Sequence, residues 1–154
     1  MSGASATDGE RQLDRSDDVR AAIVAEAMRW IGTPYHHAAN VRGAGVDCAM
    51  LLVEVYKAVG LAPVDFDPRP YSMQWFLHRD DERYLGFIGL HATRVVEPEI
   101  GDVLMYRFGR SASHGAILVE PGYIVHAYRE SGKVERVEAR AMAARFDSAW
   151  TVIR

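Results

Sequence analysis

The apolar residues near the start of the chain repeat with the period of an α-helix. Between residues 16 and 31 they recur every four positions, which predicts a helix capped by Ser16 or Asp17. The stripe consists of Val19, Ile23, Ala27 and Ile31. Residues 1–15 are small, polar and charged, so a flexible N-terminal tail is expected there.

A second helical pattern follows a loop that is rich in glycine. Residues 48–60 read CAMLLVEVYKAVG, in which the apolar residues again recur at helical spacing. Asp47 is a suitable N-cap for this helix, and Gly60 is a typical residue beyond its C-terminal cap. The preceding loop contains residues that interrupt regular structure, namely Gly32, Pro34, Gly43 and Gly45.

The middle of the chain has a weaker pattern. Residues 61–71 contain three prolines and no period, so an irregular crossing loop is expected. Ser72 can cap a short helix that extends to Leu85, with apolar residues on one side and charged residues on the other. Residues 86–96 are expected to hold the end of this helix and a short strand.

From residue 100 onwards, short β-like segments alternate with turn residues. The predicted strands cover 103–108, 114–120, 123–129, 133–138 and 149–154, with a loop at 109–113 and an alanine-rich helix at about 139–146. Because helices come first and strands follow in hairpin order, the pattern predicts an α+β fold. In this fold, N-terminal helices pack on an antiparallel β-sheet meander within a single domain, residues 16–154.

Composition and charge exclude several classes of function for the 154-residue chain. The net charge of −3 and the scattered basic residues give no electrostatic case for binding nucleic acid. No apolar segment approaches the roughly 18 residues of a membrane helix, and the polar N-terminus lacks the apolar core of a signal peptide. We therefore expect synthesis in the cytoplasm, no membrane insertion, and delivery by another molecule if the protein acts elsewhere.

The only cysteine, Cys48, lies in the first turn of the second predicted helix. Free backbone N–H groups and the positive end of the helix dipole meet there, which favours a thiolate. Cysteines in such positions, or beside a histidine, have pKa values of about 3.5 to 7.5 instead of about 8.5. Cys48 is therefore a candidate nucleophile; the alternative is a small buried hydrophobic residue.

A cysteine nucleophile needs a general base within hydrogen-bonding reach. Of the six histidines, His114 opens a predicted strand, and His126 lies in the next strand across a tight turn. Adjacent antiparallel strands can bring the two together, one as base and the other as the residue that fixes its tautomer. The alternative is that His114 is a solvated loop-end residue and His126 a half-buried strand residue.

The loop before Cys48 carries further candidates. The hydroxyl of Tyr35 can donate to an oxyanion or to the sulfur, or its ring can simply pack in the loop. No carboxylate or cysteine stands at ligand spacing from His36 and His37, so a position lining a surface or cleft is favoured over a zinc site. Together with Arg42, they can meet an anionic peptide at the rim of a cleft. We expect neither a metal nor an organic cofactor.

Five segments occur in the order found in one known family. They are GTPY at 32–35, DC at 47–48, GDVLMYR at 101–107, SHGAILVE at 113–120 and YIVHAY at 123–128. From about Val19 to its C-terminus the chain resembles the NlpC/P60 family of cysteine peptidases. The HHAANVRGAGVDC loop and the DFDPRPYSMQW segment resemble the phage-type branch, found in phage tail-tip proteins and gene transfer agents.

The resemblance implies a papain-like NlpC/P60 fold with the nucleophile at a helix N-terminus. It also implies roles for individual residues. Cys48 corresponds to the nucleophile, His114 to the general base and His126 to the third, orienting position of a Cys-His-His triad. Tyr35 and Asp47 correspond to the tyrosine and the aspartate beside the nucleophile, on the oxyanion and substrate side of the site.

Two positions depart from the family pattern. His37, on the substrate side of the site, replaces an aromatic residue common in secreted members. Ala49 and Met50 follow the cysteine where much of the family has Ser-Gly, which removes a hydroxyl from the helix start and adds bulk. These changes bear on substrate positioning more than on the nucleophile.

The implied activity is hydrolysis of peptidoglycan stem peptides, usually at the bond between D-γ-glutamate and a diamino acid. The phage-type branch further implies partners in a phage-like tail tip or baseplate and action in the periplasm or cell wall of a target cell. Two other functions stay open. One is a structural tail-tip component with residual or no activity, and the other is a thiol-dependent amidase or acyltransferase that acts on another substrate.

Overall fold

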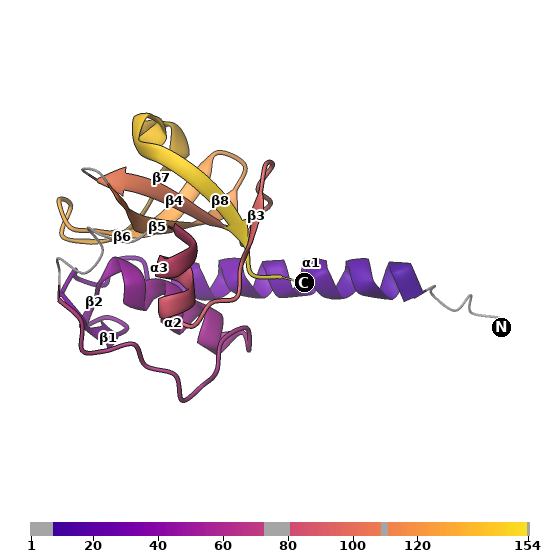
Figure 1. Ribbon diagram of the computed structural model, residues 1–154, viewed down its shortest axis with the longest axis horizontal. Helices are drawn as coiled ribbons and strands as arrows, with labels where there is room; N and C mark the ends of the chain where they lie inside the picture. The colour runs from indigo at the N-terminus through magenta and orange to yellow at the C-terminus, as the bar shows by residue number, and fades with distance from the viewer. Residues whose placement is uncertain (1–7, 73–80, 109–110, 154) are drawn as a thin grey trace.

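Helices precede strands along the chain in the computed structural model, which describes residues 8–72, 81–108 and 111–153 (Figure 1). The helices are α1 (Asp8–Arg29), α2 (Cys48–Ala58), α3 (Asp81–Phe87) and the 3-10 helix η2 (Ala139–Arg145). The strands are β1 (Asn40–Val41), β2 (Gly45–Val46), β3 (Thr93–Val95), β4 (Val103–Phe108), β5 (Ser111–Glu120), β6 (Tyr123–Tyr128), β7 (Lys133–Glu138) and β8 (Phe146–Thr151). The predicted α+β fold is confirmed.

One six-stranded antiparallel sheet forms the second half of the chain, in the order β3-β8-β4-β5-β6-β7. Strands β4 to β7 make the predicted meander. After η2 the chain returns, so that β8 pairs with the free side of β4 and β3 pairs with β8. The predicted loop at 109–113 is wrong in its second part, because β5 begins at Ser111; residues 109–110 lie outside the described residues.

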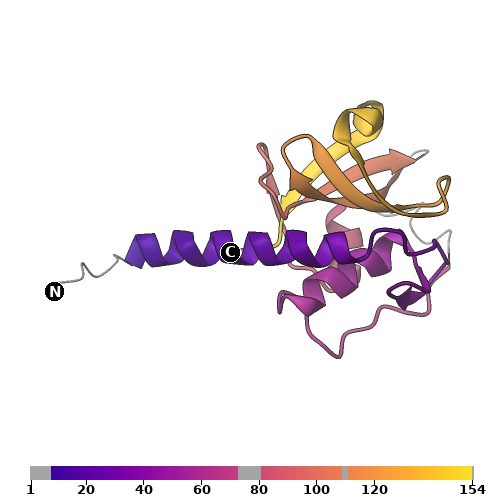
Figure 2. The same ribbon diagram turned by 180° about the vertical axis from the view of Figure 1, so that it is seen from behind.

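The sheet separates two apolar layers, as the two-residue period of β-strands requires. Met105 and Ile117 face the helices, whereas the neighbouring residues Leu104 and Ala116 face the opposite side with Met142 of η2. Figures 1 and 2 show α1, α2 and α3 on one side of the sheet and η2 on the other. The three α-helices are thus held against a single face of the sheet.

Helix α2 is the most enclosed of the described helices, and both of its predicted ends are confirmed. Every side chain from Cys48 to Val53 is buried. Asp47 caps the first turn by accepting the backbone N–H of Met50 at 2.8 Å. Gly60 follows the C-terminal cap with a φ of +80°, a left-handed conformation in which glycine avoids the strain of a side chain.

Two sequence-based boundaries differ from the structure. Helix α1 begins at Asp8 instead of Ser16, so part of the expected tail is helical, while residues 1–7 lie outside the described residues. The helix ends at Arg29. Ile31, expected to continue the apolar stripe, is 42% exposed, and Trp30 is buried instead. The helix predicted from Ser72 is described only over α3, because residues 73–80 are not described.

A buried ion pair fastens α1 to the start of β4. The guanidinium of Arg20 donates to Oδ1 of Asp102 at 2.9 Å and to the carbonyl of Ile100 at 2.9 Å. The other Asp102 oxygen accepts the backbone N–H of Glu99. From α2, the Tyr56 hydroxyl donates to the carbonyl of Gly101 at 2.7 Å. The turn at 99–102 therefore joins both long helices to the sheet.

We predict that Asp102→Ala lowers the free energy of unfolding by about 3 kcal/mol, because it leaves the buried guanidinium of Arg20 without its carboxylate. Urea denaturation followed by circular dichroism measures the change. The matched control is Glu99→Ala. Glu99 also pairs with Arg20, but its side chain is 71% exposed, so a loss below about 1 kcal/mol is expected. Equal losses in both variants would contradict the assignment of the buried pair.

Candidate active site

The sulfur of Cys48 is held between the start of α2 and the sheet. The residue is 5% exposed. Helix α2 can approach β5 closely because Gly115 has no side chain: a Cβ built there would lie 2.6 Å from Cδ1 of Leu52, one turn beyond Cys48. This contact sets the first turns of the helix against the strand residue next to His114.

His114 and His126 form a buried pair on adjacent strands. Nε2 of His114 lies 2.8 Å from Nδ1 of His126, and the two residues are 6% and 1% exposed. The ring of Tyr128 stacks on His126 with a centroid distance of 4.9 Å, and Phe108 meets the ring of His114 edge to face at 5.3 Å. The predicted proximity of the two histidines is confirmed, and the solvated alternative for His114 is wrong.

Both rings are neutral at physiological pH. Burial lowers the pKa of His114 to about 3, and the neighbouring His126 adds to this shift. Burial also lowers the pKa of His126, although the hydrogen bond and the charge of Glu135 act in the opposite direction. A neutral imidazole carries one N–H and one lone pair, so each ring can donate on one side and accept on the other.

The expected acidic thiol is wrong for this structure. Burial raises the pKa of Cys48 to about 12, and the charge of Asp47 adds to the shift. Hydrogen bonds from Tyr84 and from the backbone of Ala49 and Cys48 lower the pKa, but by less. The helix start does favour a thiolate, as the sequence suggested. The carboxylate that caps the helix and the loss of water outweigh this effect.

Asp47 joins three segments at the start of α2. It is 1% exposed, and its Oδ2 accepts the backbone N–H of Ala38 at 2.7 Å and the hydroxyl of Tyr71 at 2.5 Å. Oδ1 accepts the N–H of Met50. The predicted cap is therefore also the anchor of the preceding loop and of the crossing loop that carries Tyr71.

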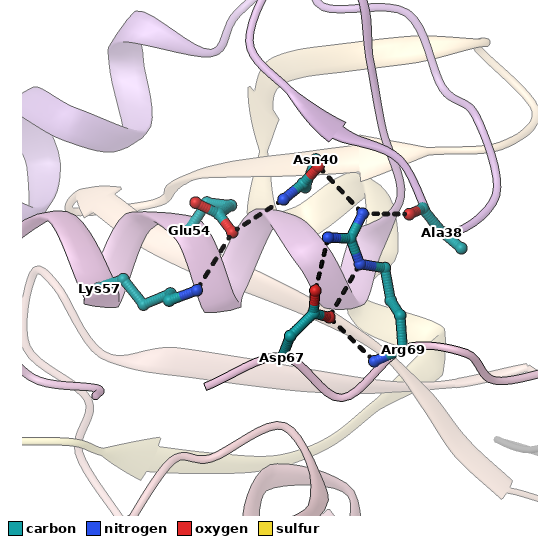
Figure 3. Close-up of polar contacts among 6 residues, drawn as sticks. All are labelled: Ala38, Asn40, Glu54, Lys57, Asp67 and Arg69. Carbon is teal, nitrogen blue, oxygen red and sulfur yellow. Dashed lines mark hydrogen bonds and ion pairs between the residues drawn. The ribbon is translucent and has the colours of Figure 1, made fainter. Parts of the chain in front are cut away.

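Residues 67–71 of the crossing loop fasten the loop before Cys48 (Figure 3). Arg69 forms an ion pair with Asp67 and donates to the carbonyl of Ala38 and to Oδ1 of Asn40, both at 3.0 Å. Asn40 in turn donates to Glu54 of α2. Ala38 has a φ of +59°, which is strained for a residue with a side chain, so these contacts hold the strained turn in place.

Two tyrosines lie beside the sulfur. The hydroxyl of Tyr84, on α3, is 3.9 Å from Sγ of Cys48, and the tyrosine is fully buried. Tyr35 is half-buried, and burial together with the nearby Cys48 raises its pKa, so its hydroxyl stays protonated and able to donate. The backbone of Tyr35 is fixed by a hydrogen bond from its N–H to the carbonyl of Gly132 at the edge of β7.

The remaining predicted site residues lie near the surface. His36, His37 and Arg42 are exposed. Nε2 of His37 lies 3.0 Å from the carbonyl of Tyr71, and its Nδ1 lies 3.9 Å from Oδ2 of Asp47. Within the described residues, no group of three or more His, Cys, Asp or Glu side chains is placed to hold a metal ion. No helix in the described ranges is long and apolar enough to cross a membrane.

Besides the rings of Phe108 and Tyr128, and within the described residues, sequence reasoning missed four residues that make polar contacts with this site or its loops. They are Arg69, Tyr71, Tyr84 and Glu135. Only Glu135 carried a usable signal, because hairpin pairing across the turn at 131–132 places it opposite His126. The other three reach the site from a loop without a period and from a short helix, so no local pattern predicts their contacts.

The fold and the site define a papain-like α+β domain with a cysteine at the N-terminus of its central helix. A model of the NlpC/P60 family matches residues 32–151. Because this match covers most of the chain, the chain belongs to the NlpC/P60 family. A comparison with curated protein sequences found no match.

Solved structures support the same fold. The NlpC/P60 domain of the peptidoglycan hydrolase SagA is 25% identical, with a TM-score of 0.58 over 86% of this chain and 97% of that domain. The peptidoglycan hydrolase RipB from Mycobacterium tuberculosis is 16% identical, with a TM-score of 0.65 over 100% of this chain and 75% of RipB. An NlpC/P60 family protein from Bacillus cereus is 18% identical, with a TM-score of 0.65. That match covers 88% of this chain but only 40% of the Bacillus cereus protein.

We predict that iodoacetamide alkylates Cys48 slowly at neutral pH and that the rate rises up to about pH 10 without levelling off. The reason is that a thiol whose pKa is raised to about 12 stays protonated throughout this range. Intact-protein mass spectrometry measures the rate. In the urea-unfolded control, the rate should level off above the ordinary cysteine pKa of about 8.5. A plateau below about pH 8 in the folded protein would show an acidic thiol instead.

Proposed function

We propose that the chain is a cysteine peptidase that hydrolyses stem peptides of bacterial peptidoglycan. In this proposal Cys48 is the nucleophile, His114 the general base and His126 the orienting residue. The observation that carries it is the buried His114–His126 hydrogen bond of 2.8 Å on strands that face the start of α2. Membership of the NlpC/P60 family, and the names of SagA and RipB as peptidoglycan hydrolases, support the substrate class.

The neutral resting state favours proton transfer during attack over a preformed ion pair. His114 takes the proton from Cys48 as the sulfur adds to the substrate carbonyl. The backbone N–H of Cys48, with Tyr35 as a second donor, stabilises the oxyanion; one such donor contributes about 3 kcal/mol. The protonated His114 then gives its proton to the leaving amine, and the acyl group stays on the sulfur as a thioester.

Water completes the cycle. His114 removes a proton from a water molecule, the resulting hydroxide adds to the thioester carbonyl, and Cys48 leaves with the proton returned by His114. One peptide bond and one water molecule are consumed, and a carboxylate and an amine are formed. All proton transfers use side chains of this chain, so the mechanism requires no metal or organic cofactor.

The finer features of the proposal rest on sequence resemblance. We propose that the bond cleaved joins D-γ-glutamate to a diamino acid, the usual bond in the family. The 36–48 loop and the 65–75 segment resemble phage-type members, so we propose delivery by a phage-like tail to the wall of a target cell. The exposed His36, His37 and Arg42 would meet the carboxylates of such a peptide.

We predict that the wild-type protein releases peptides from purified diaminopimelate-type peptidoglycan, and that Cys48→Ala and His114→Ala release none. Loss of a triad member typically costs several orders of magnitude in kcat, on the order of 10⁴ to 10⁶. Mass spectrometry of the fragments identifies the bond from the new terminal residues. His91→Ala is the matched control, since His91 is exposed and lines a surface pocket that contains neither Cys48 nor His114.

Fragments that persist in Cys48→Ala would contradict the proposal. If folded wild-type protein produces no fragments, the structural tail-tip function becomes the better account. If amide-bond transfer to an added amine exceeds hydrolysis, the protein is an acyltransferase. All three results come from the same digestion, provided that circular dichroism shows each variant to be folded.

A further inference from the structure

The hydrogen-bond chain of the two histidines continues to Glu135. Strands β6 and β7 place His126 and Glu135 directly opposite each other. Nε2 of His126 is 3.3 Å from Oε1 of Glu135, while Nδ1 on the same ring is 2.8 Å from Nε2 of His114. Both nitrogen atoms of the His126 ring are therefore engaged, one by a carboxylate and one by an imidazole.

The carboxylate of Glu135 determines which ring nitrogen of each histidine in this hydrogen-bond chain carries the proton. An ionised carboxylate accepts hydrogen bonds and donates none, so His126 carries its proton on Nε2 and offers the lone pair of Nδ1. That lone pair requires a proton on Nε2 of His114. Because His114 is also neutral, its Nδ1 keeps a lone pair and is the atom able to take a proton from a thiol.

We propose that Glu135 is a positioning residue that fixes the tautomers of His126 and His114 and so leaves Nδ1 of His114 unprotonated. Glu135 acts only through His126. Its effect on catalysis rests on the proposed function, whereas its effect on the two rings does not. Tyr128 stacks on His126, and the charge of Glu130 also reaches that ring, but only Glu135 hydrogen-bonds it from β7.

The variant Glu135→Gln tests the effect of the carboxylate on the histidine tautomers while nearly preserving the size of the side chain. Glutamine has nearly the same size, but it no longer only accepts: its carbonyl can accept from Nε2 of His126 as before, or its amide N–H can donate to an unprotonated Nε2. Where the amide donates, the proton order along the Glu135–His126–His114 hydrogen bonds reverses, and Nδ1 of His114 is protonated and unable to act as a base. We expect kcat to fall roughly 10- to 100-fold with little change in KM. In serine proteases, replacing the buried orienting aspartate lowers kcat about 10⁴-fold. A smaller loss is expected here because the Glu135 side chain is 24% exposed, so water can partly replace its hydrogen bond.

The matched control is Glu138→Gln. Glu138 lies on the same strand and pairs with Arg140, and it is opposite Tyr123 instead of a histidine. This variant should keep the kcat of the wild type. Comparable losses of kcat in both variants would show a general effect of charge on β7 and would overturn the assignment.

Histidine side-chain NMR tests the tautomers without any substrate. Two-bond ¹H–¹⁵N correlation spectra of ¹⁵N-labelled protein distinguish protonated from unprotonated ring nitrogens. Wild type should show protons on Nε2 of both His114 and His126, and Glu135→Gln should populate the Nδ1-protonated forms. Spectra and kcat that are both unchanged in Glu135→Gln would overturn the proposal. An inactive wild type whose rings still respond to Glu135→Gln would remove the proposed hydrolysis and support the assignment of Glu135.

Discussion

The buried carboxylate of Asp47 is the contact on which the geometry of the site depends. One side chain caps α2, holds the backbone of Ala38 and accepts the hydroxyl of Tyr71. Burial raises the pKa of the adjacent Cys48 thiol, and the charge of Asp47 adds to this shift. The carboxylate that holds the loop therefore acts, together with burial, against ionisation of the thiol. A catalyst with this arrangement has to move the proton of Cys48 during the reaction.

In the proposed mechanism, the tautomers of the two histidines therefore matter more than their charge. His114 and His126 lie in a buried, aromatic environment that keeps both rings neutral. Neutral rings joined end to end can hold their protons in either of two orders, and only one order leaves the inner ring able to accept. A carboxylate at the outer end, supplied by Glu135, selects that order at the edge where the sheet meets water.

The parts of the fold that sequence could predict are those determined by local chemistry. The cap at Asp47, the terminating Gly60 and the hairpin that brings His126 beside His114 depend on residues close together in the chain. The pairing of β8 with β4 and the contacts of Arg69 depend on long-range packing that no local pattern contains. The thiol pKa was predicted wrongly for a related reason: a helix start is visible in the sequence, whereas complete burial is a property of the folded chain.

The central claim is that Cys48 carries the acyl group during turnover. A soluble stem peptide containing the D-γ-glutamyl–diaminopimelate bond, mixed with excess enzyme and quenched in acid during the first turnover, tests this directly by peptide mass spectrometry. The account predicts a thioester between the glutamate γ-carbonyl and the sulfur of Cys48, which forms before the free acyl product and decays as that product appears. Cleavage of the peptide with no adduct on Cys48 at any time, together with retained turnover in Cys48→Ser, would contradict it.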